Sequence, residues 1–266
     1  MSDQVTLEQM PDGIAIIRLA RTQARNAMTL DMVRYFRATL EEASSDPSCR
    51  IIILTGADGC FCAGLDLKAA ILGEDAPEGA IPFMELQELF AGCIAQIRKL
   101  SQPVIAAIDG AAVGFGFGLA LAADIRILTP RSKFLIGAVK VGLSAGECGI
   151  SYHLPRLIGA GRAFDIMLTG RPVGADEALA IGLATRMALP EDLLDEALST
   201  ARAIAENSPY AVKHTKQVMW SNLEAPSLEA AVELENHVQV VALLTGDFRE
   251  AATAFAERRP PEFKGR

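Results

Sequence analysis

The sequence has 266 residues, of which 50% are hydrophobic and 22% are charged, and its formal net charge at pH 7 is −8. This length and composition predict a folded protein with a large hydrophobic core, and the acidic balance argues against a nucleic-acid-binding surface. No window approaches the roughly 18 consecutive apolar residues of a membrane span, and the first residues carry acids where a signal peptide carries basic residues, so we expect a cytoplasmic protein with no membrane partner.

The first two thirds of the chain alternate predicted strands with predicted helices. Short apolar runs predict strands at 13–20, 50–56, 104–109, 125–129 and 133–141. Apolar residues at helical spacing predict helices within 29–46, where Thr29 is the expected N-cap, and at 83–100. Residues 70–82 lack a packing pattern and predict a loop. Strands that alternate with helices indicate an α/β fold with a largely parallel sheet, and helical patterns dominate from about residue 161.

The cysteines do not indicate a metal site. There are five of them, and Cys60 and Cys62 are separated by one residue, which is too close for the usual zinc-ligand spacing. We therefore expect buried, reduced thiols and no bound metal.

Two strand-to-helix junctions are rich in glycine. They read RIIILTGADGCFCAGLDLK over 50–68 and VIAAIDGAAVGFGFGLALAA over 104–123. The first amides of a helix have no intrahelical acceptor and point toward the loop, so two such loops can supply two converging N–H donors, as an oxyanion hole requires. Glycine-rich turns also serve close packing alone, and both interpretations remain open at this point.

Several motifs together resemble those of the crotonase superfamily, which is the enoyl-CoA hydratase/isomerase family. They are RNAMTLDM, the two glycine-rich segments, KVGLSAGECGISYHLPRLIG and LTGRPVGADEALAIGLATRM, in that order. The resemblance covers nearly the whole chain. It implies a ClpP-like spiral of β-β-α units over residues 1–200 that carries an acyl-CoA site, and a C-terminal helical trimerisation region over 201–266. It also implies a homotrimer or a dimer of trimers, with coenzyme A bound only as part of the substrate and no separate cofactor.

The resemblance also assigns the residues of the site. It implies that the thioester oxygen sits between two backbone N–H groups, and we assign these to Ala63 and Phe115. Residues expected to contact coenzyme A are Arg25, Ala63, Gly64, Leu65, Asp66, Lys68 and Phe115, with Lys264 reaching the coenzyme A of a neighbouring subunit. For Arg25, Lys68 and Lys264, an ordinary surface charge is the alternative interpretation.

The acid–base residues depart from the pattern of the family's hydratases. The two glutamates of those hydratases correspond to Gly118 and Ala138 here, so both are absent. Glu147 lies nearby, in a turn where a branch of the family with isomerases places its proton-transferring acid. One carboxylate suffices for a 1,3-proton shift, which favours isomerisation while leaving hydration open. The alternative interpretation is that Glu147 caps the next helix or lies on the surface.

Three other functions can be compared with the sequence. A non-catalytic acyl-CoA-binding homologue is consistent with the missing glutamates. The segment GLSAG over 142–146 matches G-x-S-x-G, with Ser144 as a nucleophile and His214 as its base. A dinucleotide site is disfavoured because Leu119 stands where the last glycine of the fingerprint is needed. We expect His153 to be a packed or an exposed histidine rather than a catalytic one.

Overall fold

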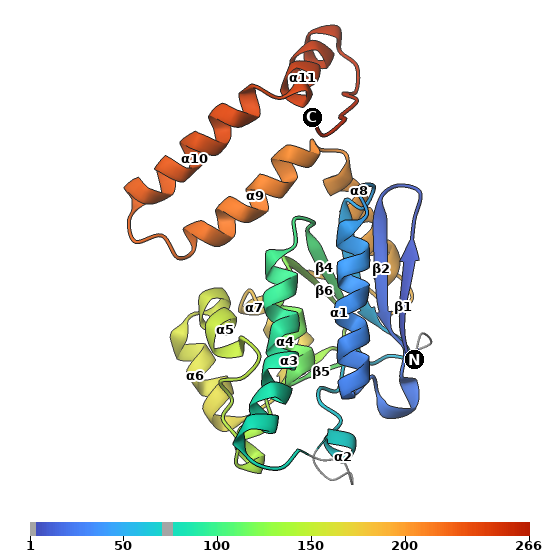
Figure 1. Ribbon diagram of the computed structural model, residues 1–266, viewed down its shortest axis with the longest axis vertical. Helices are drawn as coiled ribbons and strands as arrows, with labels where there is room; N and C mark the ends of the chain where they lie inside the picture. Colours follow the sequence, from blue (N-terminus) through green and yellow to red (C-terminus); the bar gives the residue numbers. More distant parts are fainter. Residues whose placement is uncertain (1–3, 71–76) are drawn as a thin grey trace.

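A computed structural model describes residues 4–70 and 77–266 of the chain (Figure 1). Its larger sheet has the strand order β1-β2-β3-β4-β6-β9. These strands are β1 (Val5–Gln9), β2 (Ile14–Leu19), β3 (Ile51–Gly56), β4 (Val104–Ile108), β6 (Ile125–Leu128) and β9 (Arg186–Met187). Strand β1 is antiparallel to β2, and the other neighbours are parallel, as predicted. A smaller sheet contains β5 (Ala111–Val113), β7 (Lys133–Leu135) and β8 (Val173–Gly174).

The larger sheet is buried on both faces. In β3, Ile52 and Leu54 belong to one core with helix α1, whereas Ile51 and Ile53 belong to a second core with helix α8. Side chains alternate between the faces of a strand, so the uninterrupted apolar run of β3 is what a doubly covered parallel sheet requires.

The described part of the core contains eight α-helices, two of which lie where helices were predicted, within 29–46 and near 83–100. They are α1 (Leu30–Ser45), α2 (Leu67–Ala70), α3 (Ala80–Lys99), α4 (Phe115–Ala122), α5 (Ile150–Ile158), α6 (Ala160–Thr169), α7 (Ala175–Ala180) and α8 (Leu193–Ala205), with 3-10 helices η1 (Thr22–Ala24) and η2 (Ala138–Val141). Thr29 is the N-cap of α1, and its hydroxyl accepts a hydrogen bond from the Met32 amide at 3.3 Å.

Two predicted boundaries are wrong. The loop predicted over 70–82 lies partly outside the described residues, and its last three residues form the first turn of α3, where Pro82 is tolerated because the first turn needs no N–H donor. The strand predicted over 133–141 ends at Leu135. It pairs with β5, and β5 ends at Val113 where the chain turns into α4, so the partner for further pairing runs out.

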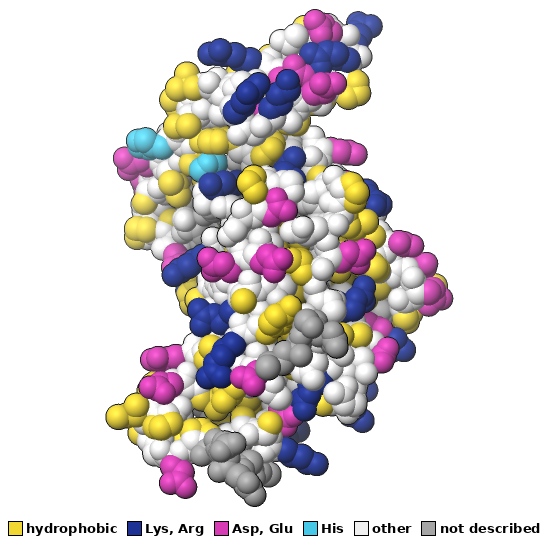
Figure 2. All heavy atoms as spheres, turned by 45° about the vertical axis from the view of Figure 1, so that its right-hand side comes forward, with side chains coloured by type: hydrophobic (Ala, Val, Ile, Leu, Met, Phe, Trp, Pro, Cys, Tyr) yellow, Lys and Arg dark blue, Asp and Glu magenta, His cyan; other side chains and the backbone are white. Residues whose placement is uncertain are grey.

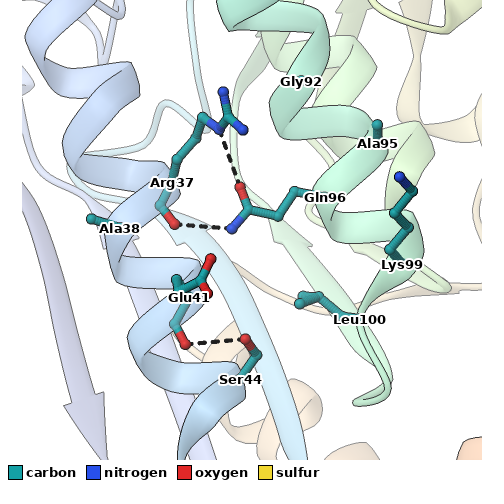
Figure 3. Close-up of a pocket in the computed structure, with 9 residues that line it drawn as sticks. All are labelled: Arg37, Ala38, Glu41, Ser44, Gly92, Ala95, Gln96, Lys99 and Leu100. Atoms are coloured by element: carbon teal, nitrogen blue, oxygen red, sulfur yellow. Dashed lines mark hydrogen bonds between the residues drawn. The ribbon is translucent and has the colours of Figure 1, made fainter.

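A polar groove of about 590 Å³ lies between α1 and α3 (Figure 3). Across it, the Gln96 amide donates to the Arg37 carbonyl at 3.0 Å and accepts from Arg37 Nε at 3.3 Å. This reciprocal pair joins the two helices on the side of the sheet that also carries α4.

The chain beyond the core forms a helical arm. It consists of α9 (Pro209–Asn222), α10 (Leu228–Leu243) and α11 (Gly246–Glu257), which extend away from both sheets (Figure 1). Helix α8 does not belong to the arm, because Leu193, Ala197 and Ala201 pack against the sheet. The predicted boundary at 200/201 therefore falls inside α8, and the core continues to Ala205.

The arm exposes many large apolar side chains. Figure 2 shows hydrophobic side chains at the surface of the upper part of the molecule, which Figure 1 shows to be the arm. They include Met219, Leu223, Leu228, Val240, Val241, Leu243, Leu244, Phe248 and Phe255. So many large exposed apolar side chains on one part of a chain are typical of interaction sites. Among the described helices, none combines the length and apolar character needed to cross a bilayer.

A buried ion pair attaches α9 to the core. Lys216 Nζ lies 2.8 Å from an Asp124 carboxylate oxygen and donates to the Gln102 carbonyl at 2.8 Å. The same carboxylate accepts the Trp220 indole N–H at 2.7 Å. Only 5% of the Lys216 side chain and 16% of the Asp124 side chain are exposed, so water screens this pair poorly.

Lys216→Met is expected to lower the free energy of unfolding by about 3 kcal/mol, because it leaves the Asp124 carboxylate without its counter-charge in a mostly buried place. Urea denaturation followed by circular dichroism measures this change. Lys213→Met is the matched control, since Lys213 lies on the same helix and is exposed. Equal unfolding midpoints for the two variants would show that the pair does not hold α9.

Candidate active site

The two glycine-rich loops lie side by side. Residues 60–66 run between residues 25–28 on one side and β5 on the other. The hydrogen bonds on the first side are Ala63 N–H to the Arg25 carbonyl, Met28 N–H to the Gly64 carbonyl and Asp66 N–H to the Met28 carbonyl, at 2.8–3.1 Å. On the second side, Cys62 and β5 exchange two backbone hydrogen bonds of 2.9 Å. The prediction that the two loops converge is therefore confirmed.

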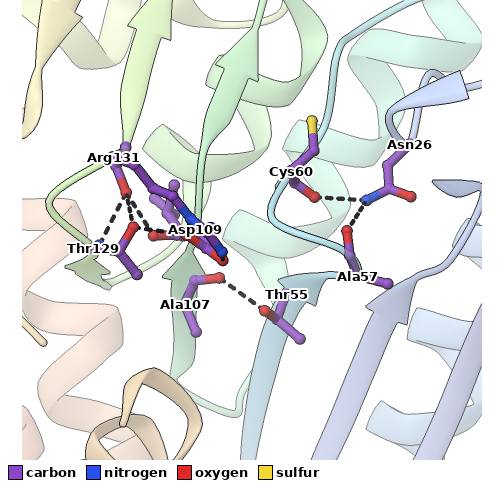
Figure 4. A network of polar contacts seen from close by, with 10 residues as sticks. Asn26, Thr55, Ala57, Cys60, Ala107, Asp109, Thr129 and Arg131 are labelled. Carbon is purple, nitrogen blue, oxygen red and sulfur yellow. Dashed lines mark hydrogen bonds and ion pairs between the residues drawn. The ribbon is translucent and has the colours of Figure 1, made fainter. Parts of the chain in front are cut away.

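Buried polar side chains lock this arrangement (Figure 4). Asn26 is fully buried, and its amide donates to the Ala57 carbonyl at 3.1 Å and to the Cys60 carbonyl at 2.6 Å. At the end of β4, Asp109 accepts hydrogen bonds from Arg131 Nε at 2.6 Å and from the Thr129 hydroxyl at 2.8 Å. The Arg131 contact is the main cause that lowers the pKa of Asp109.

Glycine is required where the loops touch. A Cβ atom at Gly116 would lie 2.3 Å from the Cys62 carbonyl oxygen, and one at Gly64 would lie 2.7 Å from the Val113 carbonyl oxygen. Gly64 also has a φ of +90°, which side chains disfavour. These glycines therefore permit close packing, and the packing is what brings the loops together.

The first predicted N–H donor, Ala63, is occupied in the structure. The Ala63 N–H already donates to the Arg25 carbonyl at 3.1 Å, so it is not free to bind a ligand. In parallel pairing, the residues on either side of a paired position bond the neighbouring strand, while the paired residue directs its own N–H away. Leu65 is the residue paired with Met28. Its N–H has no acceptor anywhere in residues 4–70 and 77–266.

The second predicted donor remains available. Phe115 is the first residue of α4, and its N–H finds no acceptor within the described part of the chain. Its nitrogen is 3.7 Å from the position of a Cβ on Gly64, the residue before Leu65. The Phe115 side chain is buried and packs edge-to-face on Phe90, with ring centroids 4.8 Å apart. Leu65 and Phe115 thus each present an N–H without an acceptor in the described residues, close to where the two loops meet.

Glu147 reaches the same place from the opposite loop. One of its carboxylate oxygens is 3.3 Å from where a Cβ on Gly114 would stand, directly before Phe115. The side chain is half-buried, and the described residues offer it no hydrogen bond or ion pair. Burial raises the pKa of Glu147. It does not cap α5, whose N-cap is Gly149, so the capping alternative is wrong.

The space that Gly118 faces is filled by the turn that carries Glu147. A Cβ on Gly118 would lie 2.7 Å from the Cys148 carbonyl oxygen and 3.0 Å from the Cys148 Cβ. Cys148 itself adopts a left-handed φ of 45°. Ala138 is buried in η2. The role of Cys148 as a filler was not foreseen, because its contact with Gly118 joins residues thirty positions apart.

A cavity of about 680 Å³ opens beside Leu65. Its lining contains Arg21, Gln23, Ala24, Ala27, Leu65, Asp66, Leu67, Lys68 and Ala69. Of the residues expected to contact coenzyme A, Leu65, Asp66 and Lys68 are here, whereas Ala63 and Gly64 lie behind them. Arg21 was missed by the sequence analysis, which offered no signal for it.

Arg21 and Asp66 form an ion pair at the rim of this cavity, 2.6 Å apart. Burial alone would raise the pKa of Asp66, but its hydrogen bonds from Arg21 and from the backbone of Ala69 and Lys68 lower it. Asp66 therefore stays ionised, caps α2 and holds Arg21 in place.

Two predicted cations lie elsewhere. Arg25 is exposed, and it contributes its backbone carbonyl rather than its side chain to the loop contact. Lys264 lies beside α11, where its N–H bonds Asp247 at 2.8 Å, and α11 and α2 are at opposite ends of the molecule (Figure 1). Within one chain, Lys264 does not reach the cavity, and its contact with a neighbouring subunit stays a prediction.

The serine-nucleophile alternative is not supported. The Ser144 hydroxyl accepts a hydrogen bond from the Gly146 amide at 3.0 Å, and no histidine of the described chain bonds to it. His153 is buried. Across the described residues, no three His, Cys, Asp or Glu side chains are placed to hold a metal ion.

Gly118→Ala is expected to lower the free energy of unfolding by about 1–3 kcal/mol, since the new methyl group forces the backbone of Cys148 to move. Differential scanning calorimetry provides the measurement. Gly161→Ala in α6 is the matched control, because a Cβ there meets open space and alanine favours a helix. A destabilisation no larger than that of the control would contradict the close contact with Cys148.

Comparisons with known proteins agree with these observations. A model of the family described as enoyl-CoA hydratase/isomerase matches residues 9–266. A probable enoyl-CoA hydratase of Mycobacterium leprae is 41% identical, over 98% of this chain and 90% of the relative. The 1,2-epoxyphenylacetyl-CoA isomerase of Escherichia coli is 30% identical, over 98% of both chains.

The fold is similar to solved structures as well. A crystal structure of a probable enoyl-CoA hydratase/isomerase from Mycobacterium abscessus superimposes with a TM-score of 0.89 at 39% identity, covering 98% of this chain and 99% of that one. The predicted α/β spiral architecture is confirmed.

Proposed function

The chain belongs to the enoyl-CoA hydratase/isomerase family, and on this premise we propose that it shifts a double bond within an enoyl-CoA thioester, with Glu147 transferring the proton. The observation that carries this proposal is the position of the Glu147 carboxylate beside Gly114, next to the unbonded N–H of Phe115. A carboxylate that can accept a proton and an N–H group that can bind negative charge are thereby close enough to act on the same part of a substrate.

The Leu65 and Phe115 amides are proposed to bind the thioester oxygen. When a proton leaves the carbon chain, negative charge develops on this oxygen, and two fixed N–H donors stabilise it without reorganising. The N-terminus of α4 adds the positive end of its helix dipole. Neither donor depends on its side chain, so phenylalanine at 115 leaves this function intact.

Glu147 is proposed to remove the proton from one carbon and to return it to another carbon of the same conjugated system. A single carboxylate completes this 1,3-shift, because it is regenerated in each cycle. Its raised pKa makes it a stronger base than an exposed glutamate and suits exchange closer to neutrality. Hydration needs an additional group to hold and activate water, and residues 118 and 138 supply none.

The substrate's coenzyme A moiety is proposed to lie along the cavity beside Leu65, with Lys68 and Arg21 as its cations. Lys264 and Arg25 are then contacts for phosphates that reach past the cavity, Lys264 from a neighbouring subunit. The exposed apolar side chains of the arm support assembly as a homotrimer or a dimer of trimers. All five cysteines are buried and unpaired, which suits the reducing cytoplasm.

Glu147→Gln is expected to reduce kcat for isomerisation of a 3-enoyl-CoA by about 10²–10⁴-fold with little change in KM, because the amide binds no less well but cannot accept the proton. Product analysis by mass spectrometry in D₂O follows both turnover and exchange. Ser144→Ala is the matched control and should retain activity. Faster hydration of crotonyl-CoA than isomerisation by the unaltered protein would instead support a hydratase, the activity named for the Mycobacterium leprae relative.

The pH dependence of kcat is expected to follow the ionisation of Glu147. The base must be ionised to take the proton, so activity falls as pH drops through its pKa. Burial raises that pKa above 4.5, so the acid limb should lie at higher pH than an exposed glutamate would produce. Steady-state rates between pH 4 and 8 test this. An acid limb centred at or below 4.5 would contradict the assignment.

A further inference from the structure

His153 supports the turn that carries Glu147. It lies in the first turn of α5 and is 3% exposed. Its Nδ1 donates to the Gly149 carbonyl at 2.9 Å, an oxygen that already accepts the backbone amides of Tyr152 and His153. The backbone of α5 already has its own hydrogen bonds to this oxygen. The additional bond from the ring therefore restrains Gly149 and the turn just before α5.

Both residues of this segment have a positive φ, which is unfavourable for the cysteine but not for the glycine. Cys148 has a φ of 45° and Gly149 a φ of 70°. A non-glycine residue in this region costs about 1–3 kcal/mol and persists only where surrounding contacts enforce it. The His153 ring is such a contact, because its Nδ1 lies 3.1 Å from where a Cβ on Gly149 would stand.

The arm prevents the His153 ring from moving away. Trp220 of α9 meets it edge-on, with ring centroids 6.0 Å apart. Trp220 is itself fixed, since its indole N–H donates to Asp124 at 2.7 Å and the Arg98 guanidinium lies over its ring. The contacts therefore run without a gap from α9 through His153 to the turn of Glu147.

The hydrogen bond also sets the state of the ring. The Gly149 carbonyl can only accept, so Nδ1 must carry the proton. Burial is the main cause that lowers the pKa of His153 to about 4, and the neighbouring charges of Arg98, Arg126 and Arg156 act in the same direction. The ring is then neutral at neutral pH and remains a fixed donor.

We propose that His153 is a positioning residue for the proposed reaction: its Nδ1–H and its ring, backed by Trp220, hold the turn at 147–149 so that the Glu147 carboxylate faces Gly114 and the Phe115 amide. His153 acts through Glu147 and does not touch the substrate. This inference rests on the proposed function of Glu147, and it adds that docking of the arm onto the core sets the geometry of proton transfer.

The test compares two variants at this position with one elsewhere. His153→Phe keeps a planar ring and removes the donor, whereas His153→Asn keeps an N–H donor at the place of Nδ1. His237→Phe is the matched control, because His237 Nδ1 makes the same bond to the carbonyl four residues earlier, at 2.7 Å, on an exposed part of α10.

His153→Phe is expected to lower kcat roughly 100-fold, as a shift of about 1 Å in a reacting group does, while KM changes less than about threefold. His153→Asn should recover most of kcat, and His237→Phe should match the unaltered protein. The acid limb of kcat should move to lower pH in His153→Phe as Glu147 gains solvent. Wild-type kcat in His153→Phe, or equal losses in the Phe and Asn variants, would overturn the proposal.

A double variant separates positioning from general destabilisation. If His153 acts through Glu147, then His153→Phe should cost little further activity in a Glu147→Gln background. Additive losses would mean that His153 affects something else, and would overturn the proposal.

A readout without turnover distinguishes this inference from the proposed function. The carboxyl carbon of Glu147 is titrated by ¹³C NMR and identified by its absence in Glu147→Gln. Should the protein isomerise no enoyl-CoA, the proposed function fails, but a Glu147 pKa that falls toward the ordinary value in His153→Phe and is restored in His153→Asn still supports positioning. An unchanged titration overturns it.

Discussion

The pairing of residues 60–66 with a backbone segment on each side is the interaction on which the proposed active site depends. Parallel pairing uses the N–H groups of Ala63 and Asp66 on one side and of Cys62 on the other, which leaves the Leu65 N–H unbonded. The same contact brings the N-terminus of α4 against this segment, because Gly116 allows the backbones to touch. The free N–H groups of Leu65 and Phe115 therefore result from the way the loops pack. Asn26 stabilises that packing with hydrogen bonds from its buried amide.

The missing glutamates and the presence of Glu147 are connected by packing. The turn at 147–149 fills the space in front of Gly118 with the Cys148 backbone, so a longer side chain at 118 and this turn exclude one another. The turn delivers a carboxylate to the other side of the same small space, beside Gly114. Moving the acid from position 118 to position 147 therefore requires a different conformation of the turn at 147–149, while the backbone N–H donors keep their places.

The arm and the active site share one set of contacts. Asp124 binds Lys216 and Trp220 of α9, Trp220 packs on His153, and His153 braces the turn of Glu147. Helix α10, all of which is described, has no buried residue, so the arm depends on α9 for its attachment within one chain. Whatever covers the apolar surface of the arm is then linked through these contacts to the position of Glu147, the proposed proton-transferring residue.

The sequence by itself determined strands β2, β3, β4 and β6, the cap of α1 at Thr29 and the family, because each depends on residues close together in the chain or on motifs with fixed spacing. The same kind of local motif led to Glu147 as the candidate acid. It did not reveal that Ala63 is occupied and Leu65 is free, since alternate residues of an extended segment differ only in which neighbour they face. The ends of β7 and of the core, the filling role of Cys148 and the support from His153 and Trp220 were likewise decided by tertiary structure. Each depends on a contact between segments that are distant in sequence. Packing selects one contact partner for each residue, and no pattern along the chain identifies that partner.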